Sequence, residues 1–298
     1  MTGTFYFSWE QTVQKMTALE RMAPGLLLIE EWGKTEDGRG ILGIHVGDAK
    51  GDFHLLIQGG MHGREYMNCA VLLMQLEEYL KKGVSKDLCI HLLPMVNPDG
   101  CTISQQGPAG IRSFRLRKGL WEIYEREGGI RPAREYFSRW KANAKGVDPN
   151  RNFMAGWEKA KKSRPSSEGY PGTAPETEKE TQAILKLQKA FPLSLCVSYH
   201  SSGNLVYWDY GAKGELFERE KRLASDISRV TGYPICSTQQ VMAAEGGCSD
   251  HFVLHGRIPA VTIETGESPC PLPQWELRQI YEKNRQVWDA LAKFLGKK

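Results

Sequence analysis

The chain has 298 residues, of which 41% are hydrophobic and 25% are charged, and its formal net charge is +4. This composition is typical of a globular protein with a large core, built as one large α/β domain or two smaller ones. The small positive excess does not favour nucleic acid as a partner, and no uninterrupted apolar run approaches membrane-spanning length.

The N-terminus and the cysteines bear on the compartment of the protein. The chain begins MTGTFYFSWEQTVQKM, without a basic segment followed by an apolar one, so we expect no secretory signal. Seven cysteines occur without a CxxC pair, and several lie in apolar runs such as LSLCVSYH. These features predict reduced, buried thiols and a cytoplasmic protein rather than a disulfide framework.

Strand and helix patterns alternate along most of the chain. In chain order we expect a helix in 7–22, strands in 41–48 and 53–60, a helix in 65–82, a strand in 87–100 that ends in a Pro-Asp-Gly turn, helices in 131–142 and 175–191, strands in 193–200 and 260–266, and a closing helix in 272–295. This alternation predicts an α/β fold with a largely parallel or mixed sheet and helices on both of its faces.

Four of the apolar runs end in polar side chains, and in such sheets ligands bind beyond the carboxyl ends of the strands. The first run ends near His62 and Glu65, the second at Asn97-Pro98-Asp99-Gly100, the third at His200 and the fourth at Glu264. Their convergence carries more weight than any single run and predicts a site at this edge of the sheet.

His62 and Glu65 suit two ligand positions of a zinc site, because an i, i+3 pair at a helix entry aims two side chains at one point. The alternative is a surface histidine and a glutamate that stabilises a helix N-terminus. His200 is a candidate third ligand, with His251 and His255 as competitors. The chain has no HExxH, which excludes helix-borne zincin chemistry.

Glu264 ends the run AVTI, where a carboxylate is costly unless it is paired or used in chemistry. Desolvation would raise its pKa towards the range of a general base, and a structural salt bridge is the alternative. In VDPNRNF, Asn150 and Arg151 offer donors for a carboxylate, and Asp148 could orient a metal-bound histidine. A polar turn is the alternative interpretation of this segment.

Together these motifs resemble the zinc metallocarboxypeptidase family. The similarity extends over roughly residues 26–266 and rests on HGRE (62–65), NPDG (97–100), VDPNRNF (147–153), His200-Ser201, GGCSD (246–250) and TIET (262–265). It implies one catalytic domain over residues 1–298, an α/β/α sandwich with a mixed, mostly parallel sheet of about eight strands.

The resemblance also implies roles for individual residues. His62, Glu65 and His200 would bind one zinc ion, and Glu264 would be the general base and acid. Substrate would be held by Arg64, Asn150 and Arg151, while Asp148 would steady a ligand histidine. The oxyanion-stabilising arginine is expected in IRSFRLRKG (111–119), where Arg117 fits best and Arg115 nearly as well.

Within the family the chain is similar to bacterial γ-D-glutamyl–diamino acid peptidases of cell-wall stem peptides. The similarity lies in FSRWKANAKGVDPNRNF (137–153), EGYPGTAPETEKET (168–181) and the long insertion between NPDG and VDPNRNF. The chain departs from digestive carboxypeptidases at Met242, where they carry a substrate-capping tyrosine, and at Ser202, where they carry another tyrosine. Ser249 takes the position that sets their specificity and is neither apolar nor acidic.

The expected activity is therefore zinc-dependent hydrolysis of an amide in a peptide or muropeptide with a free carboxylate. Three other activities stay open at this point. They are a general carboxypeptidase, a deacylase of N-acyl amino acids, and a catalytically silent module that keeps zinc for structure. Glu264 argues against the last, because a structural zinc site closes its fourth position and needs no base.

Overall fold

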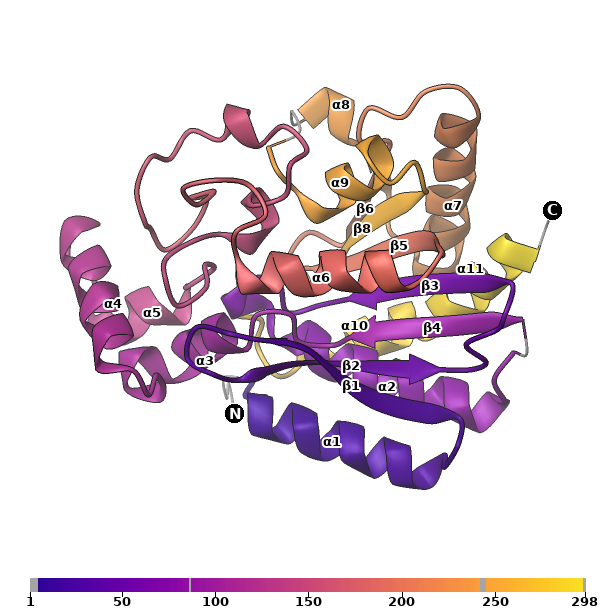
Figure 1. Cartoon of the computed structure of the whole chain (residues 1–298), viewed down its shortest axis with the longest axis horizontal. Coiled ribbons are helices and arrows are strands. Elements are labelled where there is room, and N and C mark those ends of the chain that lie inside the picture. Colours follow the sequence, from indigo (N-terminus) through magenta and orange to yellow (C-terminus); the bar gives the residue numbers. More distant parts are fainter. Residues whose placement is uncertain (1–4, 86, 242–244, 297–298) are drawn as a thin grey trace.

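A mixed β-sheet forms the middle layer of the protein in this computed structural model, which describes residues 5–85, 87–241 and 245–296 (Figure 1). Within these residues the sheet has eight strands in the order β1-β2-β4-β3-β5-β8-β6-β7. The strands are β1 (Leu27–Lys34), β2 (Gly40–Val46), β3 (Phe53–Gln58), β4 (Leu88–Leu93), β5 (Leu193–His200), β6 (Leu205–Trp208), β7 (Ile235–Ser237) and β8 (Ala260–Glu264).

The centre of the sheet is parallel and its edges are mixed. Strands β4, β3, β5 and β8 pair in parallel, as do β6 and β7, whereas β1–β2, β2–β4 and β6–β8 pair antiparallel. Every residue of β4 is buried, as expected for a parallel strand covered on both faces. The prediction of a mixed, mostly parallel sheet of about eight strands is confirmed.

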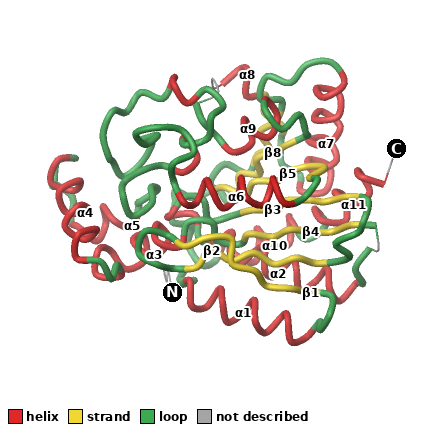
Figure 2. The backbone as a smooth tube through the Cα atoms, in the orientation of Figure 1, coloured by secondary structure: helices red, strands yellow, loops and turns green. Residues whose placement is uncertain are grey.

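Helices cover both faces of the sheet and complete the α/β/α sandwich (Figures 1 and 2). One face packs against α1 (Trp9–Met22), α2 (Met67–Lys82), α7 (Glu215–Thr231) and α11 (Val287–Gly296), and α10 (Glu276–Asn284) packs on α2 and α7. The other face packs against α6 (Lys179–Ala190) and α9 (Cys248–Leu254). The two apolar clusters on either side of the sheet hold these layers together, since burial of apolar surface is the main favourable term in folding.

Several shorter helices lie outside these two layers. Helices α3 (Pro98–Gln106), α4 (Phe114–Arg126) and α5 (Ala133–Ser138) gather at one end of the sheet around their own apolar cluster (Figure 1). Helix α8 (Thr238–Val241) and four 3₁₀ turns complete the described elements, the turns being η1 (Gly63–Glu65), η2 (Gly107–Gly110), η3 (Pro149–Arg151) and η4 (Trp157–Lys159).

Some predicted elements differ from those in the structure. The closing helix is interrupted and becomes α10 and α11, and the helix expected in 131–142 is only the short α5. The strand expected in 87–100 ends at Leu93, and Pro98-Asp99-Gly100 is not a turn but the start of α3, where the Asn97 side chain caps the helix by accepting a hydrogen bond from the Gly100 N–H. Helices α4 and α7 and strands β1, β6 and β7 were not predicted.

The structure also describes the state of the cysteines and the character of the helices. All seven cysteines are free thiols, and five of them are buried. In the described part of the chain no helix combines the length and the apolar character that crossing a membrane requires.

Candidate metal and catalytic site

Three neighbouring parallel strands bring the predicted reactive residues to one edge of the sheet. Strand β3 lies beside β5, and β5 beside β8, so their carboxyl ends meet. His200 and Glu264 are the last residues of β5 and β8 and pair directly in the register. His62 follows the end of β3 after a short turn. Motifs that lie far apart in the sequence therefore form one cluster.

The turn after β3 depends on its glycines. Gly60 has φ +61°, a conformation that residues with a side chain rarely adopt. A Cβ there would lie 2.7 Å from Cys69 Sγ and 3.1 Å from the Cα of Met95. The backbone therefore turns sharply off the strand and places His62 and the η1 turn over the sheet edge.

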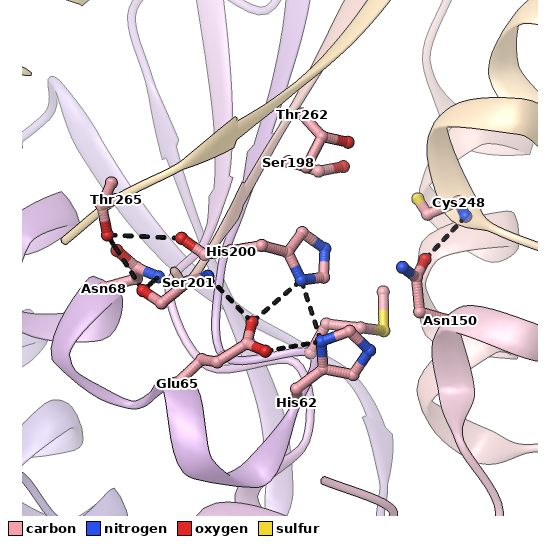
Figure 3. Close-up of polar contacts among 12 residues, drawn as sticks. His62, Glu65, Asn68, Asn150, Ser198, His200, Ser201, Cys248, Thr262 and Thr265 are labelled. Carbon is pink, nitrogen blue, oxygen red and sulfur yellow. Dashed lines mark hydrogen bonds and ion pairs between the residues drawn. The ribbon is translucent and has the colours of Figure 1, made fainter. Parts of the chain in front are cut away.

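The side chains of His62, Glu65 and His200 form a small triangle of donor atoms (Figure 3). His62 Nδ1 lies 2.9 Å from Glu65 Oε1, and His200 Nδ1 lies 2.9 Å from Glu65 Oε2. The two Nδ1 atoms are 3.0 Å apart. Two imidazoles and one carboxylate that face a common point are the ligand set of a catalytic zinc site with one open position.

The ionisation states of these groups fit metal binding. Burial disfavours a charged Glu65, but the two imidazoles outweigh burial and hold its pKa well below the usual range. Burial also lowers the pKa of His62. Burial lowers the pKa of His200, but the hydrogen bond to Glu65 and the charges of Glu65 and Glu264 together outweigh burial, so the pKa is raised. A carboxylate that stays ionised is a ready cation ligand.

Asp148 lies beside the triangle and holds His62 from its other side. Asp148 Oδ1 is 3.2 Å from His62 Nε2, and the same carboxylate accepts hydrogen bonds from the N–H groups of Asn150 and Gly169. Burial alone would raise the pKa of Asp148, but its interactions with His62 and the charges of Lys141 and Arg151 together keep it well below the usual range. Such a carboxylate fixes the tautomer and orientation of a metal-bound imidazole.

A second group of polar residues, not identified from the sequence, ties the helix entry to the strand ends (Figure 3). Asn68 on α2 donates to Ser201 Oγ at 3.0 Å and accepts from Thr265 Oγ1 at 2.7 Å. Ser201 Oγ and Thr265 Oγ1 are also 3.0 Å apart. The Ser201 N–H donates to Glu65 Oε2, so this network positions the carboxylate of the triangle.

Glu264 lies partly buried beside the triangle. Its removal from water raises its pKa to about 7, a shift that nearby His200 opposes. A carboxyl group with a pKa near neutrality is suited to take up and release a proton. The positive charges of Lys141 and Arg64 also act on Glu264.

The structure brings Lys141, and not Arg117, to the reactive residues. Arg117 lies on α4, where its guanidinium donates to the carbonyls of Ile111 (2.7 Å) and Arg112 (2.9 Å). Arg115 is exposed on the same helix. The positive charge of Lys141, by contrast, acts on both imidazoles of the triangle and on Glu264.

Lys141 is held next to the triangle by its backbone. Its carbonyl accepts a hydrogen bond from the Gly63 N–H at 3.0 Å, within the η1 turn. It follows Trp140 in FSRWKANAKGVDPNRNF, a stretch noted above for its resemblance to the cell-wall peptidases. Its closeness to the triangle comes from this backbone contact, which the sequence does not reveal.

The hydrogen bond and the ion pair of Arg64 are with residues outside the triangle. Its guanidinium donates to the Arg139 carbonyl at 3.3 Å and lies 3.4 Å from Glu168 Oε2. Its charge nevertheless reaches Glu264, which places Arg64 at the rim of the site.

Asn150 lies across from the two imidazoles (Figure 3). Its Oδ1 accepts a hydrogen bond from the Cys248 N–H at 2.9 Å, which leaves the amide nitrogen facing the site. Arg151 is partly exposed, donates to the Asn150 carbonyl at 2.9 Å and lies 3.6 Å from Glu245 Oε2. An amide and a guanidinium side by side can bind a carboxylate.

Ser249 lies in a buried cluster of hydroxyl groups. Its Oγ is 3.0 Å from Thr262 Oγ1 and 3.3 Å from Ser198 Oγ, and Tyr210 donates to Thr262 Oγ1 at 2.7 Å. The other three hydroxyls come from β5, β8 and the segment after β6, and no sequence pattern indicated that they would meet. Met242 lies outside the described residues.

The competing histidines do not reach the triangle. His251 lies on α9 with its Nε2 2.9 Å from Gln188 Oε1, and its ring stacks on that of His255 at a centroid distance of 5.6 Å. Their places on this helix leave His200 as the histidine that joins His62 and Glu65.

Comparison with known proteins identifies the family. Residues 12–289 match the model of the zinc carboxypeptidase family. The chain belongs to the zinc carboxypeptidase family. The donor triangle of His62, Glu65 and His200 fits zinc, the metal for which the family is named.

Two relatives and one solved structure illustrate the similarity. The chain is 28% identical to a γ-D-glutamyl-L-diamino acid endopeptidase of Lysinibacillus sphaericus, over 80% of this chain and 61% of that protein. It is 27% identical to mouse carboxypeptidase A2, over 82% of this chain and 58% of the relative. The chain thus spans about three fifths of the length of both.

The fold likeness extends over the whole domain. Bovine thrombin-activatable fibrinolysis inhibitor, solved in complex with tick carboxypeptidase inhibitor, superposes with a TM-score of 0.75. The match covers 99% of this chain and 98% of that chain at 18% identity, so it supports the fold alone.

Proposed function

We propose that this protein hydrolyses the amide bond between γ-D-glutamate and the diamino acid of a muropeptide, using one zinc ion at the donor triangle. The observation that carries the proposal is the convergence of the triangle, Glu264 and the Asn150-Arg151 pair at one sheet edge. The similarity to a γ-D-glutamyl-L-diamino acid endopeptidase supports this substrate class.

We assign His62, Glu65 and His200 as the ligands, with Asp148 orienting His62. Bound zinc supplies a Lewis acid that activates water and polarises a carbonyl. Glu264 takes the proton of the attacking water and later delivers it to the leaving amine, as its pKa of about 7 allows. Lys141 supplies positive charge for the oxyanion that develops on the scissile carbonyl.

Substrate orientation is assigned to the opposite wall of the site. The Asn150 amide and the Arg151 guanidinium bind a carboxylate on the leaving-group side, which sets the position of the scissile bond. Diaminopimelate offers such a carboxylate. Ser249 and its neighbouring hydroxyls suit a polar side chain better than an aromatic one, because a polar group can hydrogen-bond to them and an apolar ring cannot. Arg64 at the rim contacts the remainder of the substrate.

The substrate class is tested with purified protein, with and without a chelator, on L-Ala-γ-D-Glu-meso-diaminopimelate, ordinary peptides and N-acyl amino acids. We expect zinc-dependent release of diaminopimelate and slow cleavage of the other two classes. If the protein cleaves ordinary peptides but not the tripeptide, it is a general carboxypeptidase. This is the second candidate function, because of the similarity to carboxypeptidase A2. Hydrolysis of N-acyl amino acids alone would leave a deacylase.

The role of Glu264 is tested by Glu264→Gln. This variant keeps the shape of the side chain but removes the base, so we expect full zinc content and a fall in kcat of about 10²-fold or more. The exposed Glu267→Gln is the matched control and should keep its rate. An unchanged rate in Glu264→Gln would refute the role as base.

A further inference from the structure

A second group of metal-binding side chains lies within the sheet, apart from the catalytic residues. His54 on β3 and Cys89 and His91 on β4 are all buried, and their donor atoms lie within 4.8 Å of one another. His54 is near the start of β3, whereas His62 follows its end. The two groups therefore lie at different places along the same strand.

Strand pairing puts these side chains on one face of the sheet. His54 pairs with Cys89 across the β3–β4 boundary, and His91 lies two residues further along β4. Because side chains alternate between the faces of a strand, Cys89 and His91 point to the same side. His45 on β2 pairs with His91 and joins them there.

The contacts between the imidazoles define which nitrogen of each ring faces the cluster. His54 Nδ1 lies 2.9 Å from His91 Nε2, and the other nitrogen of His91, Nδ1, lies 2.6 Å from His45 Nδ1. His45 Nε2 is in turn 3.2 Å from Glu30 Oε2. The chain of groups thus runs from a partly exposed carboxylate inwards to His54 and Cys89.

This order of contacts is the one that a metal-bound histidine requires. A ligand imidazole binds through one nitrogen and usually donates its other N–H to a fixed acceptor. With His91 Nε2 on the metal side, its Nδ1–H donates to His45 Nδ1, and the N–H of His45 at Nε2 faces Glu30. A neutral His91 then uses its single N–H, while Nε2 of His45 lies 3.2 Å from Glu30 Oε2 without forming a hydrogen bond.

Hydrogen bonds without a metal could also hold the three imidazoles together, but they would not account for the position of the Cys89 thiol beside them. In the described part of the chain the Cys89 thiol has no hydrogen-bond partner, although it lies among imidazole nitrogens. The Phe191 ring stacks on His91 at a centroid distance of 4.0 Å and covers the cluster with apolar surface. A thiol and imidazoles in a dry site are the ligands that borderline cations such as zinc prefer.

We propose that His54, Cys89 and His91 form a second zinc site, buried in the sheet and separate from the catalytic one. On binding, the thiol proton of Cys89 is released to solvent and its sulfur binds as thiolate. The ion joins β3 to β4 at the end of the strands remote from the catalytic residues. This inference does not depend on the proposed substrate.

Cobalt distinguishes the two sites because only the second contains sulfur. The metal-free protein is titrated with Co²⁺ and followed by absorption spectroscopy, with Zn²⁺ content measured in parallel. We expect two metal ions per chain and a thiolate-to-cobalt charge-transfer band that saturates with one of the two equivalents. One ion per chain without such a band would overturn the proposal.

Single-residue variants identify the cysteine that produces the charge-transfer band. Cys89→Ser should lose the band and one equivalent of metal, while Cys196→Ser, at a buried cysteine outside the cluster, should keep both. His62→Ala should lose the other equivalent and keep the band. His54→Ala serves as a second test if the serine variant does not fold, and it should also lose one equivalent. A band that persists in Cys89→Ser would refute the assignment.

Discussion

At the scale of single residues, the position of positive charge determines how the site can stabilise an oxyanion. The charge of Lys141 affects Glu264 and the imidazoles, whereas the guanidinium of Arg117 donates hydrogen bonds to two backbone carbonyls of its own segment. A lysine concentrates its charge at one nitrogen and can rotate its three donors, so it can follow an oxygen as charge develops on it.

We therefore predict that Lys141→Ala lowers kcat about 10²- to 10³-fold, as expected for loss of one oxyanion donor. KM should change much less, because the interaction forms mainly in the transition state. Lys141→Arg should restore part of the rate. Steady-state kinetics on the cleaved substrate measures these effects.

Arg117→Ala is the matched control, since it removes a cation that the structure keeps on α4. We expect its kcat to stay within a few-fold of the wild type. A large loss in Arg117→Ala with no loss in Lys141→Ala would restore the original assignment.

Residue type at strand ends was enough to predict His62, Glu65, His200 and Glu264 as one cluster. Lys141 was missed because its approach depends on a single backbone contact, from the Gly63 N–H to its carbonyl, which no local pattern encodes. The hydroxyls around Ser249 come from separate elements, and their meeting depends on strand order and on the packing of α9.

At the scale of elements, the η1 turn fits its surroundings because position 63 has no side chain. A Cβ at Gly63 would lie 2.4 Å from the carbonyl oxygen of Gly100 and 2.8 Å from that of Trp140. Both neighbours are backbone atoms, which cannot move aside as a flexible side chain could. Any substitution would displace the turn that carries Glu65.

We predict that Gly63→Ala lowers the free energy of unfolding by roughly 1 to 3 kcal/mol, the usual cost of overpacking, and weakens zinc binding at the triangle. Gly119→Ala on α4 is the control, because a Cβ there meets nothing within 4 Å. It should stabilise the protein slightly, since alanine favours a helix over glycine. Urea denaturation and zinc titration measure both effects, and equal behaviour of the two variants would contradict the prediction.

Glu220 on helix α7 makes the free energy of unfolding depend on pH. This carboxyl group is buried and accepts a hydrogen bond from the Ala260 N–H at 2.9 Å, at the start of β8. Burial raises its pKa to about 8. In the folded state it therefore keeps a proton that the unfolded chain releases near pH 4.5, so its contribution to stability falls as pH rises from about 4.5 to about 8.

Glu220→Gln should remove this penalty while keeping an oxygen acceptor for Ala260. We expect a gain of roughly 1 to 3 kcal/mol in the free energy of unfolding at pH 9, and little change near pH 4. The exposed Glu218→Gln on the same helix should follow the wild-type curve. Urea denaturation between pH 4 and 9 is the measurement, and parallel curves for wild type and Glu220→Gln would refute it.

Periodicity predicted the long helices and central strands but not all of their limits. The break between α10 and α11 follows from Asn284, whose side chain donates to the Ile280 carbonyl and to Tyr233 Oη. Its own carbonyl accepts from Gln75 Nε2 on α2. These contacts compete with the helical hydrogen bonds and involve partners far away in the sequence, so no local pattern reveals them.

At the scale of the whole molecule, the order of the strands could not be derived from the sequence. Strand β8 inserts between β5 and β6, which brings Glu264 beside His200. Alternating patterns indicate a sheet covered by helices, but they do not state which strands are neighbours. The family resemblance supplied the layers and the approximate number of strands, which the structure confirms, but not the strand order.

The large apolar clusters on both faces of the sheet lie apart from the donor triangle, so the fold should survive loss of the catalytic metal. We predict that a chelator abolishes hydrolysis but leaves the far-ultraviolet circular dichroism spectrum unchanged at 25 °C. Bound zinc adds about 2.7 kcal/mol when its free concentration is 100-fold above Kd. Its removal should therefore lower Tm by roughly 5 to 10 °C.

The measurement is a thermal melt of Cys89→Ser with chelator, and again after Zn²⁺ is restored. This background leaves the donor triangle as the zinc site to be titrated, so the shift in Tm reports on His62, Glu65 and His200 alone. His62→Ala in the same background should show the low Tm with or without Zn²⁺. A chelated protein that unfolds at 25 °C would mean that the triangle, rather than the apolar clusters, holds the sheet edge together.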